Sequence, residues 1–577
     1  MNRLSLVTVS LLAACGTSSG PPANEPARRS ATVETREGGG GGDWPEWGRT
    51  PSKNMMSEAK NLPFELDPGK LKPDGTPDLA TAKNALWAVK MGSQTYGNPA
   101  VANGRLYVGT NNEGRGDPRF KGDYSRVVCL EAATGKEIWT LTIPKLGTGK
   151  VGDWEFLGVC SHPTVVENRV YVMTNRCEVI CLDVNGLADG NQGVQDEANY
   201  MAFVGTTPGK PVEMKPTDAD IIWRYDMIYE LGVFPHNITA GSPLVVGDIV
   251  YLSTSNGVTY DHTELPSPKS PALIALNRKI AERPGVTPAE MLVGEEASRI
   301  SKRIFHGAWT GPAWGEVGGK GVLLFPGPDG FAYAFDPNPV KDADGFGIFP
   351  EKWRYDCNPP DLRYKNGDKT QPLKYATLGG GPSEIIATPV FYKGRFYAPI
   401  GQDPEHRPGP GNYTCIDLAT GKKVWDVRMD RSLSTSSIVD DLIYTGDLSG
   451  WLTCIDANKG TILWRYNTLA EIWSSTLVAD GKVYVGNKDG MLSVFATDRM
   501  KKLADELGPG LEVEIESGKL VLKKGEKAAR EISGDEVGQI FREAKFPAEL
   551  HCSPIVAQGV LYVATMRHLY AFKAGAK

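Results

Sequence analysis

Short runs of alternating hydrophobic and polar residues recur along most of the chain. The pattern is clearest between Thr435 and Phe495, where two copies of one unit follow each other, the first from Ser436 and the second from Ser475. In each copy, turn residues such as Gly, Asp and Asn separate runs rich in Val, Ile, Leu and Tyr. This alternation predicts short β-strands joined into an antiparallel meander. A unit of about forty residues with four strands is typical of one blade of a β-propeller.

Further copies of the unit are recognised by their first two strands. In most copies the first strand opens with a small residue, Pro and an apolar residue, and the second contains an apolar residue followed by Tyr. The eight copies begin at Asn98, His162, Ser242, Gly311, Thr388, Ser436, Ser475 and Ser553. We therefore expect an all-β fold, an eight-bladed β-propeller.

The fourth strand of the unit often follows a Thr-Gly or Lys-Gly turn and ends in Trp, as at Trp139, Trp425 and Trp464. The last copy has no such strand, whereas a strand of this character, around Trp87, precedes the first copy. A closed ring leaves no open strand edge. We therefore expect residues 87–91 to pair with residues 569–572, so that an N-terminal strand closes the last blade.

The amino terminus does not follow the repeat. Residues 1–15 contain a short apolar run that ends in Leu-Ala-Ala-Cys15, too short to span a bilayer. This stretch resembles a bacterial lipoprotein signal, which implies cleavage before Cys15, a lipid on its thiol and, with Gly at the next position, the outer membrane. An ordinary secretory signal with a chance cysteine is the alternative. Residues 16–43 predict a flexible tether, and residues 44–577 the propeller.

Composition narrows the class of partner. The net charge is -6 with a pI of about 5.8, so nothing favours binding to nucleic acid. With Gly 66 and Pro 41, the chain is rich in turns, as an all-β protein of many short strands requires. Insertions at 183–220, 277–303 and 497–549 interrupt the repeat, and the last of them is strongly charged.

The turn-and-Trp pattern carries a family resemblance. The form Asp/Glu-x-x-Thr-Gly-x-x-x-Trp, as in the stretches that end at Trp139 and Trp425, resembles the tryptophan-docking motif of the quinoprotein alcohol dehydrogenase superfamily, the pyrroloquinoline quinone (PQQ) repeat. The chain is similar to bacterial PQQ-binding-like β-propeller repeat proteins. The outer-membrane assembly lipoprotein of the BamB type shares this architecture. The resemblance implies tryptophan-docked blades around one axis.

In this fold the blade entries and the loops between second and third strands lie on one face, and all seven histidines are expected there. Loops on one face of a rigid scaffold are a common place for a binding site. The alternative is that polar loops collect histidines that do not converge. The candidate ligand-binding residues are Tyr96, His162, His236, Asn256, His306, Trp309, His406, Trp473 and His551.

The resemblance also raises the question of whether the protein is a catalyst. A quinoprotein dehydrogenase needs PQQ, a Ca²⁺ held by oxygen ligands and a carboxylate base. Asn256, in Ser-Thr-Ser-Asn-Gly, resembles a family Ca²⁺ ligand, whereas the entry around His306 lacks the family's Asp. The family's Glu ligand and its pair of adjacent cysteines have no counterpart. We therefore expect no required cofactor and no catalysis. If the protein is an enzyme, His306 and Asn256 are the candidate catalytic residues.

Two further sites are expected from local patterns. Oxygen-bearing residues alternate with Gly in the loop that holds Asp183, Asn185, Asp189 and Asn191, which suits a Ca²⁺ ion, although Asx turns explain the pattern equally well. Pairing Val166 with Val170 in a hairpin brings Cys160 within one residue of a position opposite Cys177. A bulge would then allow a disulfide between the two.

These observations predict an envelope-anchored, non-catalytic binding or scaffold lipoprotein on the periplasmic side of the outer membrane. Its partner would be a protein, a peptide or a small ligand, and it would contact the membrane through its lipid alone. The alternatives are a PQQ-dependent dehydrogenase and an outer-membrane assembly factor of the BamB type, which would use the charged insertion at 497–549.

Overall fold

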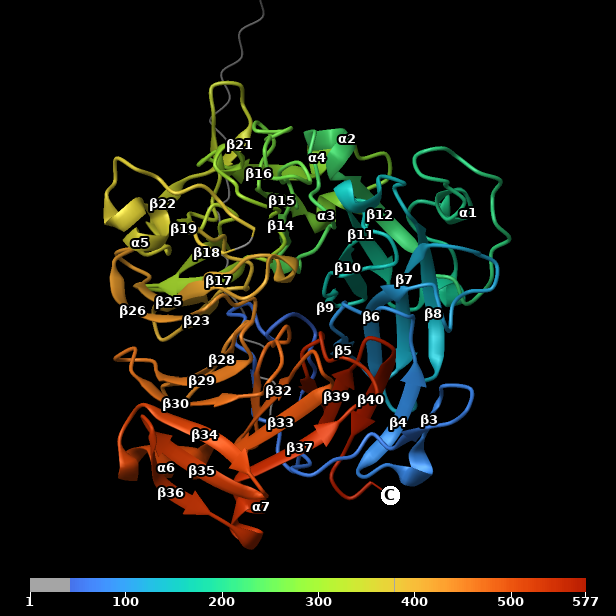
Figure 1. Ribbon diagram of the computed structural model, residues 1–577. Helices are drawn as coiled ribbons and strands as arrows, with labels where there is room; N and C mark the ends of the chain where they lie inside the picture. Colours follow the sequence, from blue (N-terminus) through green and yellow to red (C-terminus); the bar gives the residue numbers. More distant parts are fainter. Residues whose placement is uncertain (1–41, 378, 577) are drawn as a thin grey trace, which may run out of the picture.

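The structure is a computed structural model that describes residues 42–377 and 379–576. The signal at 1–15 with Cys15, and the tether up to residue 41, lie outside the described residues. Antiparallel four-strand meanders follow one another around a common axis (Figure 1). The expected all-β β-propeller is confirmed.

Eight sheets contain such a meander, and we number them in chain order. Sheet 1 holds β5 (Ala100–Ala102), β6 (Arg105–Asn111), β7 (Tyr124–Glu131) and β8 (Glu137–Pro144); sheet 2 holds β9 (Thr164–Val166), β10 (Arg169–Met173), β11 (Glu178–Asp183) and β12 (Ile221–Asp226). Sheet 3 holds β13 (Leu244–Val246), β14 (Ile249–Ser253), β15 (Leu273–Asn277) and β16 (Leu292–Glu296); sheet 4 holds β17 (Ala313–Val317), β18 (Lys320–Pro326), β19 (Phe331–Phe335) and β22 (Glu351–Asp356).

The second half of the chain continues the series. Sheet 5 holds β23 (Val390–Tyr392), β24 (Arg395–Pro399), β25 (Pro410–Asp417) and β26 (Lys423–Asp430); sheet 6 holds β27 (Ser437–Val439), β28 (Leu442–Gly446), β29 (Trp451–Asp456) and β30 (Ile462–Asn467). Sheet 7 holds β31 (Leu477–Ala479), β32 (Lys482–Gly486), β33 (Met491–Ala496) and β37 (Phe541–Lys545); sheet 8 holds β38 (Ile555–Ala557), β39 (Val560–Ala564), β40 (His568–Phe572) and β4 (Ala85–Lys90).

Sheet 8 joins the two ends of the propeller. Its outer strand is β4, which pairs antiparallel with β40 in a register that places Trp87 opposite Ala571. The pairing expected between residues 87–91 and 569–572 is therefore confirmed. The strand edge that β40 would otherwise expose is covered by β4.

Tryptophans near the start of fourth strands connect neighbouring sheets. The indole Nε1 of Trp87, in sheet 8, donates to the carbonyl of Ala132, in sheet 1, over 3.0 Å. Its ring covers Gly135 so closely that a Cβ on this glycine would lie 2.7 Å from the indole. The Thr-Gly turn therefore needs glycine for space as well as for its positive φ. The same hydrogen bond is made by Trp139 to Val184, Trp353 to Leu418 and Trp425 to Ala457.

An N-terminal segment, residues 44–57, lines the inner edges of the sheets, a feature that the repeat pattern did not predict. Trp44 and Val101 of sheet 1 exchange two backbone hydrogen bonds of 2.8 Å, and Val165 of sheet 2 donates to Pro45. The segment then accepts backbone bonds from sheets 4 and 5, and β1 (Met56–Ser57) pairs parallel with β31. It crosses the centre of the ring, where Figure 1 draws it in blue.

The insertions contribute outer strands to the sheets and short helices beside them. The insertion at 183–220 contains α1 (Glu197–Tyr200), and the one at 277–303 contains α3 (Arg278–Ala281), α4 (Pro288–Met291) and β16. The insertion at 497–549 contains α6 (Thr497–Leu507), α7 (Val537–Ile540), β37 and the hairpin strands β34 (Leu511–Glu516), β35 (Lys519–Lys524) and β36 (Lys527–Ile532). The remaining α-helices and strands are β2 (Lys70–Leu71), β3 (Pro77–Asp78), α2 (Met227–Leu231), β20 (Val340–Lys341), β21 (Gly347–Phe349) and α5 (Pro360–Arg363).

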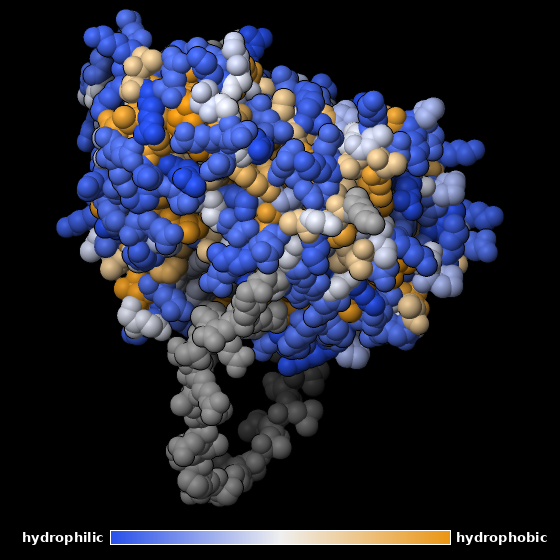
Figure 2. All heavy atoms as spheres, turned by 90° about the horizontal axis from the view of Figure 1, so that it is seen from below, coloured by the Kyte–Doolittle hydropathy of each residue, from blue (hydrophilic) through white to orange (hydrophobic). Residues whose placement is uncertain are grey.

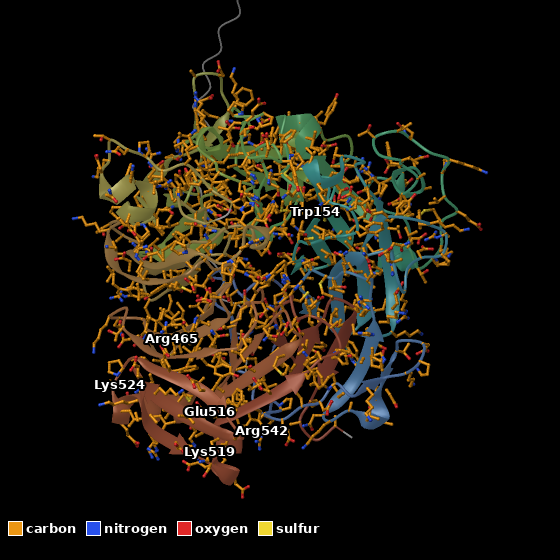
Figure 3. All side chains as sticks on the ribbon, in the orientation of Figure 1. Trp154, Arg465, Glu516, Lys519, Lys524 and Arg542 are labelled. Atoms are coloured by element: carbon orange, nitrogen blue, oxygen red, sulfur yellow. The ribbon has the colours of Figure 1, made fainter. Side chains whose placement is uncertain are left out.

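The charged insertion enlarges one sheet. Its strand β34 pairs parallel with β30, so sheet 6 grows to seven strands with β36 at the edge. In Figure 3 the labelled Lys519 and Lys524 lie in the lower left part of the molecule, far from Trp154. The face drawn in Figure 2 is mainly hydrophilic, with hydrophobic residues in small groups. Among the described residues, no helix is long and apolar enough to cross a membrane.

Candidate metal centre and axial cavity

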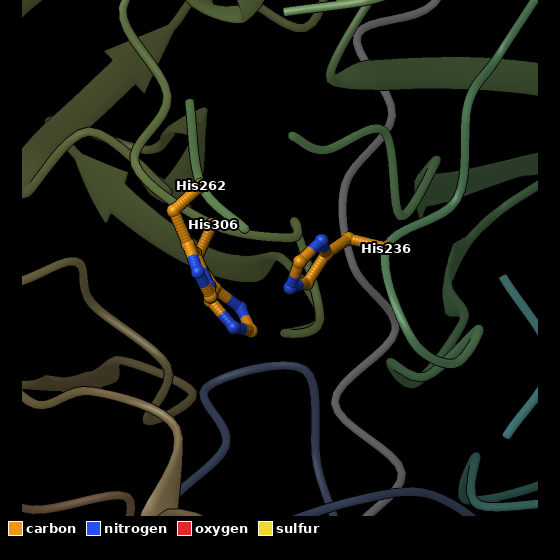
Figure 4. A group of neighbouring side chains, drawn as sticks. All are labelled: His236, His262 and His306. Carbon is orange, nitrogen blue, oxygen red and sulfur yellow. The ribbon is translucent and has the colours of Figure 1, made fainter. Parts of the chain in front are cut away.

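Four histidines converge on one face of the propeller, and we call them the His cluster: His236, His262, His306 and His406. The ring centroids of His236 and His306 are 4.1 Å apart, and those of His262 and His306 are 5.0 Å apart. His406 completes the group at 4.9 Å from His262 and 5.3 Å from His306. Figure 4 shows the rings of His236, His262 and His306 pointing toward one another.

The elements that carry these rings belong to three neighbouring sheets. His236 precedes β13, and His262 lies in the loop between β14 and β15, both in sheet 3. His306 precedes β17 of sheet 4, and His406 lies in the loop between β24 and β25 of sheet 5. The segments that precede the first strands and the loops that join the second and third strands lie on the same face of the propeller, close to its axis. The histidines were expected to share one face. Four of the seven contact one another there.

Asn256 holds three of these loops together. Its Oδ1 accepts a hydrogen bond from the backbone of Phe234 over 2.9 Å, and its Nδ2 donates to Ser267 and Ser301. Its backbone carbonyl accepts from Ala308. Because the amide is fully buried and both of its ends are engaged, Asn256 fixes the loops that carry His236, His262 and His306.

Neighbouring groups fix the tautomers of two rings. Nδ1 of His236 lies 2.7 Å from the carbonyl of Val258, so it carries the proton and leaves the Nε2 lone pair free. Nδ1 of His406 lies 3.0 Å from the hydroxyl of Tyr375, which itself donates to Glu384 over 3.2 Å. In that chain His406 donates through Nδ1, so its Nε2 is also left with a lone pair.

Burial keeps the rings neutral. Desolvation lowers the pKa of His236 to about 4 and that of His406 to about 3, and it lowers the pKa values of His262 and His306 as well. Asp403 lies beside them, with its Oδ2 3.5 Å from Nε2 of His306. Burial raises the pKa of Asp403 to about 6. Neutral imidazole is the form of histidine that binds metal ions.

Next to the His cluster lies an axial cavity of about 130 Å³, lined by the entries of six sheets. Trp47 of the N-terminal segment lines it, and its Nε1 donates to Oγ1 of Thr435 over 3.1 Å. His162 meets the Trp47 ring edge to face, and its Nδ1 lies 2.9 Å from the Asn98 carbonyl. The other lining residues are Cys160, Ala240, Gly241, Ser242, Trp309, Thr310, Gly311, Ile386, Thr388 and Leu433.

Trp309 joins the cavity to the His cluster. It lines the cavity, its ring stands at 88° to that of His306 with centroids 4.5 Å apart, and its Nε1 donates to the His236 carbonyl. A separate stack lies between sheets 7, 8 and 1. There the rings of Tyr96, Trp473 and His551 contact one another: the His551 centroid is 5.3 Å from that of Tyr96 and 4.3 Å from that of Trp473, and the last two are 6.4 Å apart.

The nine residues expected on the ligand face therefore fall into three groups. His236, His306 and His406 belong to the His cluster, with Asn256 behind it and Trp309 at its border; His162 lines the axial cavity; and Tyr96, Trp473 and His551 form the stack. Asp403, Tyr375 and Glu384 were missed, although Asp403 stands only three residues before His406. Trp47 was missed because it lies outside every repeat.

The expected disulfide between Cys160 and Cys177 is wrong, because both cysteines are free. In the hairpin Val170 pairs with Val165 instead of Val166, and β9 begins only at Thr164, so the pairing never reaches Cys160. Cys177 is buried, with its Sγ 3.4 Å from the carbonyl of Thr254 in the neighbouring sheet. Cys160 lines the axial cavity instead.

The loop expected to bind Ca²⁺ has protein partners for its side chains. Asp183 forms an ion pair of 2.6 Å with Arg169 and accepts from the backbone of Asn185. Asn185 donates to Asp189, and Asn191 donates to Glu197. This arrangement favours the Asx-turn alternative. A calcium ion in this loop stays a prediction.

Comparisons with known proteins place the chain among repeat propellers. The family model for the outer membrane protein assembly factor BamB, named PQQ_2, matches residues 79–262 and 411–503. The outer membrane protein assembly factor BamB of Shewanella oneidensis is 29% identical over 82 residues, which cover 14% of this chain and 21% of that protein. The matched stretch thus spans about a fifth of that relative's length.

Two solved structures are similar to the chain at low identity. BamB from Moraxella catarrhalis is 11% identical with a TM-score of 0.34, covering 85% of this chain and 99% of that one. The quinohemoprotein alcohol dehydrogenase from Comamonas testosteroni is 13% identical with a TM-score of 0.43, covering 93% and 81%. Likeness at these scores carries no argument about activity.

The tryptophan-docked sheets define the class as β-propeller. The PQQ-type repeats and the family model, which matches just under half of the chain, make it similar to β-propeller proteins of the PQQ-repeat family. The resemblance inferred from the repeats is confirmed.

Proposed function

We propose that the protein is a non-catalytic binding module of the cell envelope, held there by a lipid on Cys15. In this proposal the eight sheets are the eight blades of one closed ring, anchored on the periplasmic side of the outer membrane. The observation that carries the binding role is the axial cavity, whose wall is assembled from six sheets and from the N-terminal segment. A recess on the axis of a rigid ring is a suitable place for a ligand.

The lining of the cavity indicates what it would accept. Its side chains are aromatic, aliphatic, hydroxyl and thiol groups, together with Asn98 and a His162 that is kept neutral by burial. A neutral group therefore fits this recess better than a charged one. At about 130 Å³ the cavity admits a small ligand or one side chain of a peptide or protein, which inserts along the axis.

The same measurements argue against a quinoprotein dehydrogenase. Pockets for molecules of drug or cofactor size have volumes of roughly 300–1,000 Å³, whereas the cavity here has about 130 Å³ and Trp47 forms part of its wall. The amide of Asn256, the residue at the family's calcium position, is engaged at both ends. The residues present therefore do not fit PQQ with Ca²⁺, and we propose that neither is required.

An assembly role of the BamB type is the second candidate. The family match supports it, and so does the enlarged sheet 6, whose edge strand β36 exposes nearly all of its residues. An exposed edge strand can pair with a strand of another protein. No feature of the net charge favours nucleic acid as a partner.

Site-specific photo-crosslinking in cells tests the binding role. A photoreactive amino acid at Leu433, in the cavity wall, should form a discrete adduct with the ligand or partner. The matched control is Val424, an apolar residue of the outer strand β26 that is 41% exposed. The proposal fails if Leu433 gives no adduct beyond that of Val424. An adduct from a third position, Ala528 in β36, would instead support the assembly role.

A further inference from the structure

The strongest unexplained feature of the molecule is a set of buried ring nitrogens without partners in the His cluster. Nε2 of His236, Nε2 of His262 and both nitrogens of His306 have no hydrogen-bond partner among the described residues. A buried polar atom left unpaired destabilises the folded state, and four of them at one point are unusual in a native fold. Their grouping indicates that something absent from the chain itself binds there.

We propose that His236, His262, His306 and His406 bind one divalent first-row transition-metal ion, with Asp403 supplying a neighbouring negative charge. This inference goes beyond the binding role proposed above and does not depend on it. The described residues contain two sets whose ligand atoms all lie within 4.8 Å of one another: His236, His262 and His306, and His306, Asp403 and His406. His306 belongs to both sets, so it lies at the centre.

The spacing suits a metal that the loops close around. Imidazole nitrogens bind Zn²⁺ at about 2.0–2.1 Å, which places the nitrogens of a tetrahedral set about 3.4 Å apart. Within each of the two sets the ligand atoms lie within 4.8 Å of one another. Within a set, each ligand atom would therefore move by about 1 Å or less to close around the ion. Three sheets carry the four rings, so the ion would also tie sheets 3, 4 and 5 together.

The groups behind the rings prepare them for a metal. Ligating histidines usually donate their second ring N–H to a carbonyl, a carboxylate or another acceptor, which fixes the tautomer. His236 does so to the Val258 carbonyl, and His406 contacts Tyr375, which hydrogen-bonds Glu384. These contacts aim the lone pairs into the cluster. A row of histidines that merely fills a polar loop would not need them.

The donor set selects the class of ion. Imidazole suits Zn²⁺, Cu²⁺, Ni²⁺ and related ions, whereas Ca²⁺ and Mg²⁺ prefer oxygen ligands. One nearby carboxylate, Asp403, offsets part of the charge of a dication. A quinoprotein site with Ca²⁺ is a different arrangement, because the cluster offers nitrogen where calcium needs oxygen.

Metal titration of the full chain tests the proposal. The protein is purified in detergent without a histidine tag, stripped with a chelator and titrated with Co²⁺, whose visible absorption reports nitrogen ligation. Bound metal is then counted after loading with Zn²⁺ and dialysis. We expect one ion per chain, visible Co²⁺ bands that Zn²⁺ abolishes, and no effect of Ca²⁺ on either.

Variants assign the ligands. His306→Gln should lose the Co²⁺ bands and weaken binding at least 100-fold, and Asp403→Asn should weaken it about tenfold. The matched control is His568→Gln, because His568 lies in sheet 8 and contacts Gly75, and it should bind like the unchanged protein. Circular dichroism checks that each variant folds. If His306→Gln does not fold, His262→Gln takes its place, since His262 is less buried.

Two outcomes would overturn the proposal. One is less than about a fifth of an ion per chain in the loaded protein, which would mean that the cluster is a polar pocket filled by water. The other is a folded ligand variant that retains one tightly bound ion with unchanged Co²⁺ bands, which would place the metal elsewhere.

Discussion

Trp47 and Thr435 lie 388 positions apart in the chain and are joined by a hydrogen bond of 3.1 Å between the indole Nε1 and the threonine Oγ1. This bond ties the N-terminal segment to the inner edge of sheet 6. Trp47 is 8% exposed and packs against His162 of sheet 2 on its other side. The segment is therefore a structural part of the ring and not a linker that merely leads to the first blade.

Replacing this tryptophan should destabilise the protein and enlarge the axial cavity. Substitution of a buried Trp by Ala typically costs about 3–5 kcal/mol, because contacts are lost and a cavity remains. We expect Trp47→Ala to lower the free energy of unfolding, measured by urea denaturation, by about that amount. The control Val204→Ala, at a residue that is 71% exposed, should change it by less than about 0.5 kcal/mol. Equal effects of the two variants would contradict a structural role for Trp47.

A buried ion pair holds the same segment in shape. Nζ of Lys53, which has no exposed side-chain surface, lies 2.6 Å from Glu46. Removing one partner of a buried pair leaves an uncompensated charge and costs about 3–5 kcal/mol. We expect Lys53→Met to destabilise strongly in urea denaturation. The double variant Lys53→Met with Glu46→Leu should recover most of the loss, because no lone charge remains. A double variant as unstable as the single one would show that Lys53 acts through other contacts.

The sequence could predict the ring because its signals are local and repeated. Each docking Trp faces a small residue across the strand pair, as Trp139 faces Cys129 and Trp425 faces Cys415. The Thr-Gly turn and the Trp are the residues that pack neighbouring sheets together, and both occur within a single repeat, so the repeat pattern predicts this packing. The closure by β4 followed from the same pattern, since Trp87 faces Ala571.

The sequence predicted the face on which the candidate site lies. It could not predict which side chains meet there, because that depends on the conformations of the loops. The fold placed the histidines on one face, but nothing in the spacing between His262 and His306 shows that their rings meet. That contact depends on tertiary bonds such as those of Asn256. The disulfide failed for a similar reason, since a one-residue change in register moved Cys177 out of reach. The N-terminal segment has no repeating hydrophobic pattern that could predict it, because its backbone hydrogen bonds go to several different sheets.

Truncation separates the tether from the structural segment. Deleting residues 1–42 leaves Trp47 and Lys53 in place and, among the described residues, removes the backbone hydrogen bond that Gln558 donates to Gly42, so folding should be nearly unaffected. Deleting residues 1–57 leaves β4 in place but removes the segment that binds sheets 1, 2, 4, 5, 6 and 7. We expect this longer deletion to abolish cooperative thermal unfolding or to lower the Tm sharply. A normal Tm for the longer deletion would contradict the role assigned to the segment.

Fractionation tests the anchor. In the proposal, lipid on Cys15 retains the protein in the membrane, so Cys15→Ser should move it to the soluble envelope fraction. Because Cys15 lies in the amino-terminal signal, the same substitution should leave the Tm of the purified protein unchanged. The control is Cys160→Ser, whose thiol lines the axial cavity, and it should remain in the membrane fraction. Retention of the Cys15→Ser protein in membranes would contradict lipid anchoring.

A carboxyl group in sheet 6 should make stability depend on pH. Asp447 follows β28, is 2% exposed and accepts backbone hydrogen bonds from Ser449 and Trp451. Desolvation by burial raises the pKa of Asp447 to about 7. The backbone hydrogen bonds act in the opposite direction, but their effect is smaller. The folded state therefore binds this proton more tightly than the unfolded state does, in which an Asp has a pKa of about 3.9. Its contribution to stability is greatest below about pH 4 and is lost as the pH rises toward 7.

The variant Asp447→Asn isolates this contribution, because the amide keeps an oxygen that accepts the backbone bonds and cannot lose a proton. We expect the free energy of unfolding of the unchanged protein to fall, relative to that of Asp447→Asn, by up to about 1.4 kcal/mol per pH unit between pH 4 and 7. Urea denaturation at a series of pH values measures the difference. The control is Asp489→Asn, at the equivalent turn of sheet 7, where the acid is less buried. Parallel pH curves for the unchanged protein and Asp447→Asn would mean that Asp447 is already ionised in the folded state at low pH.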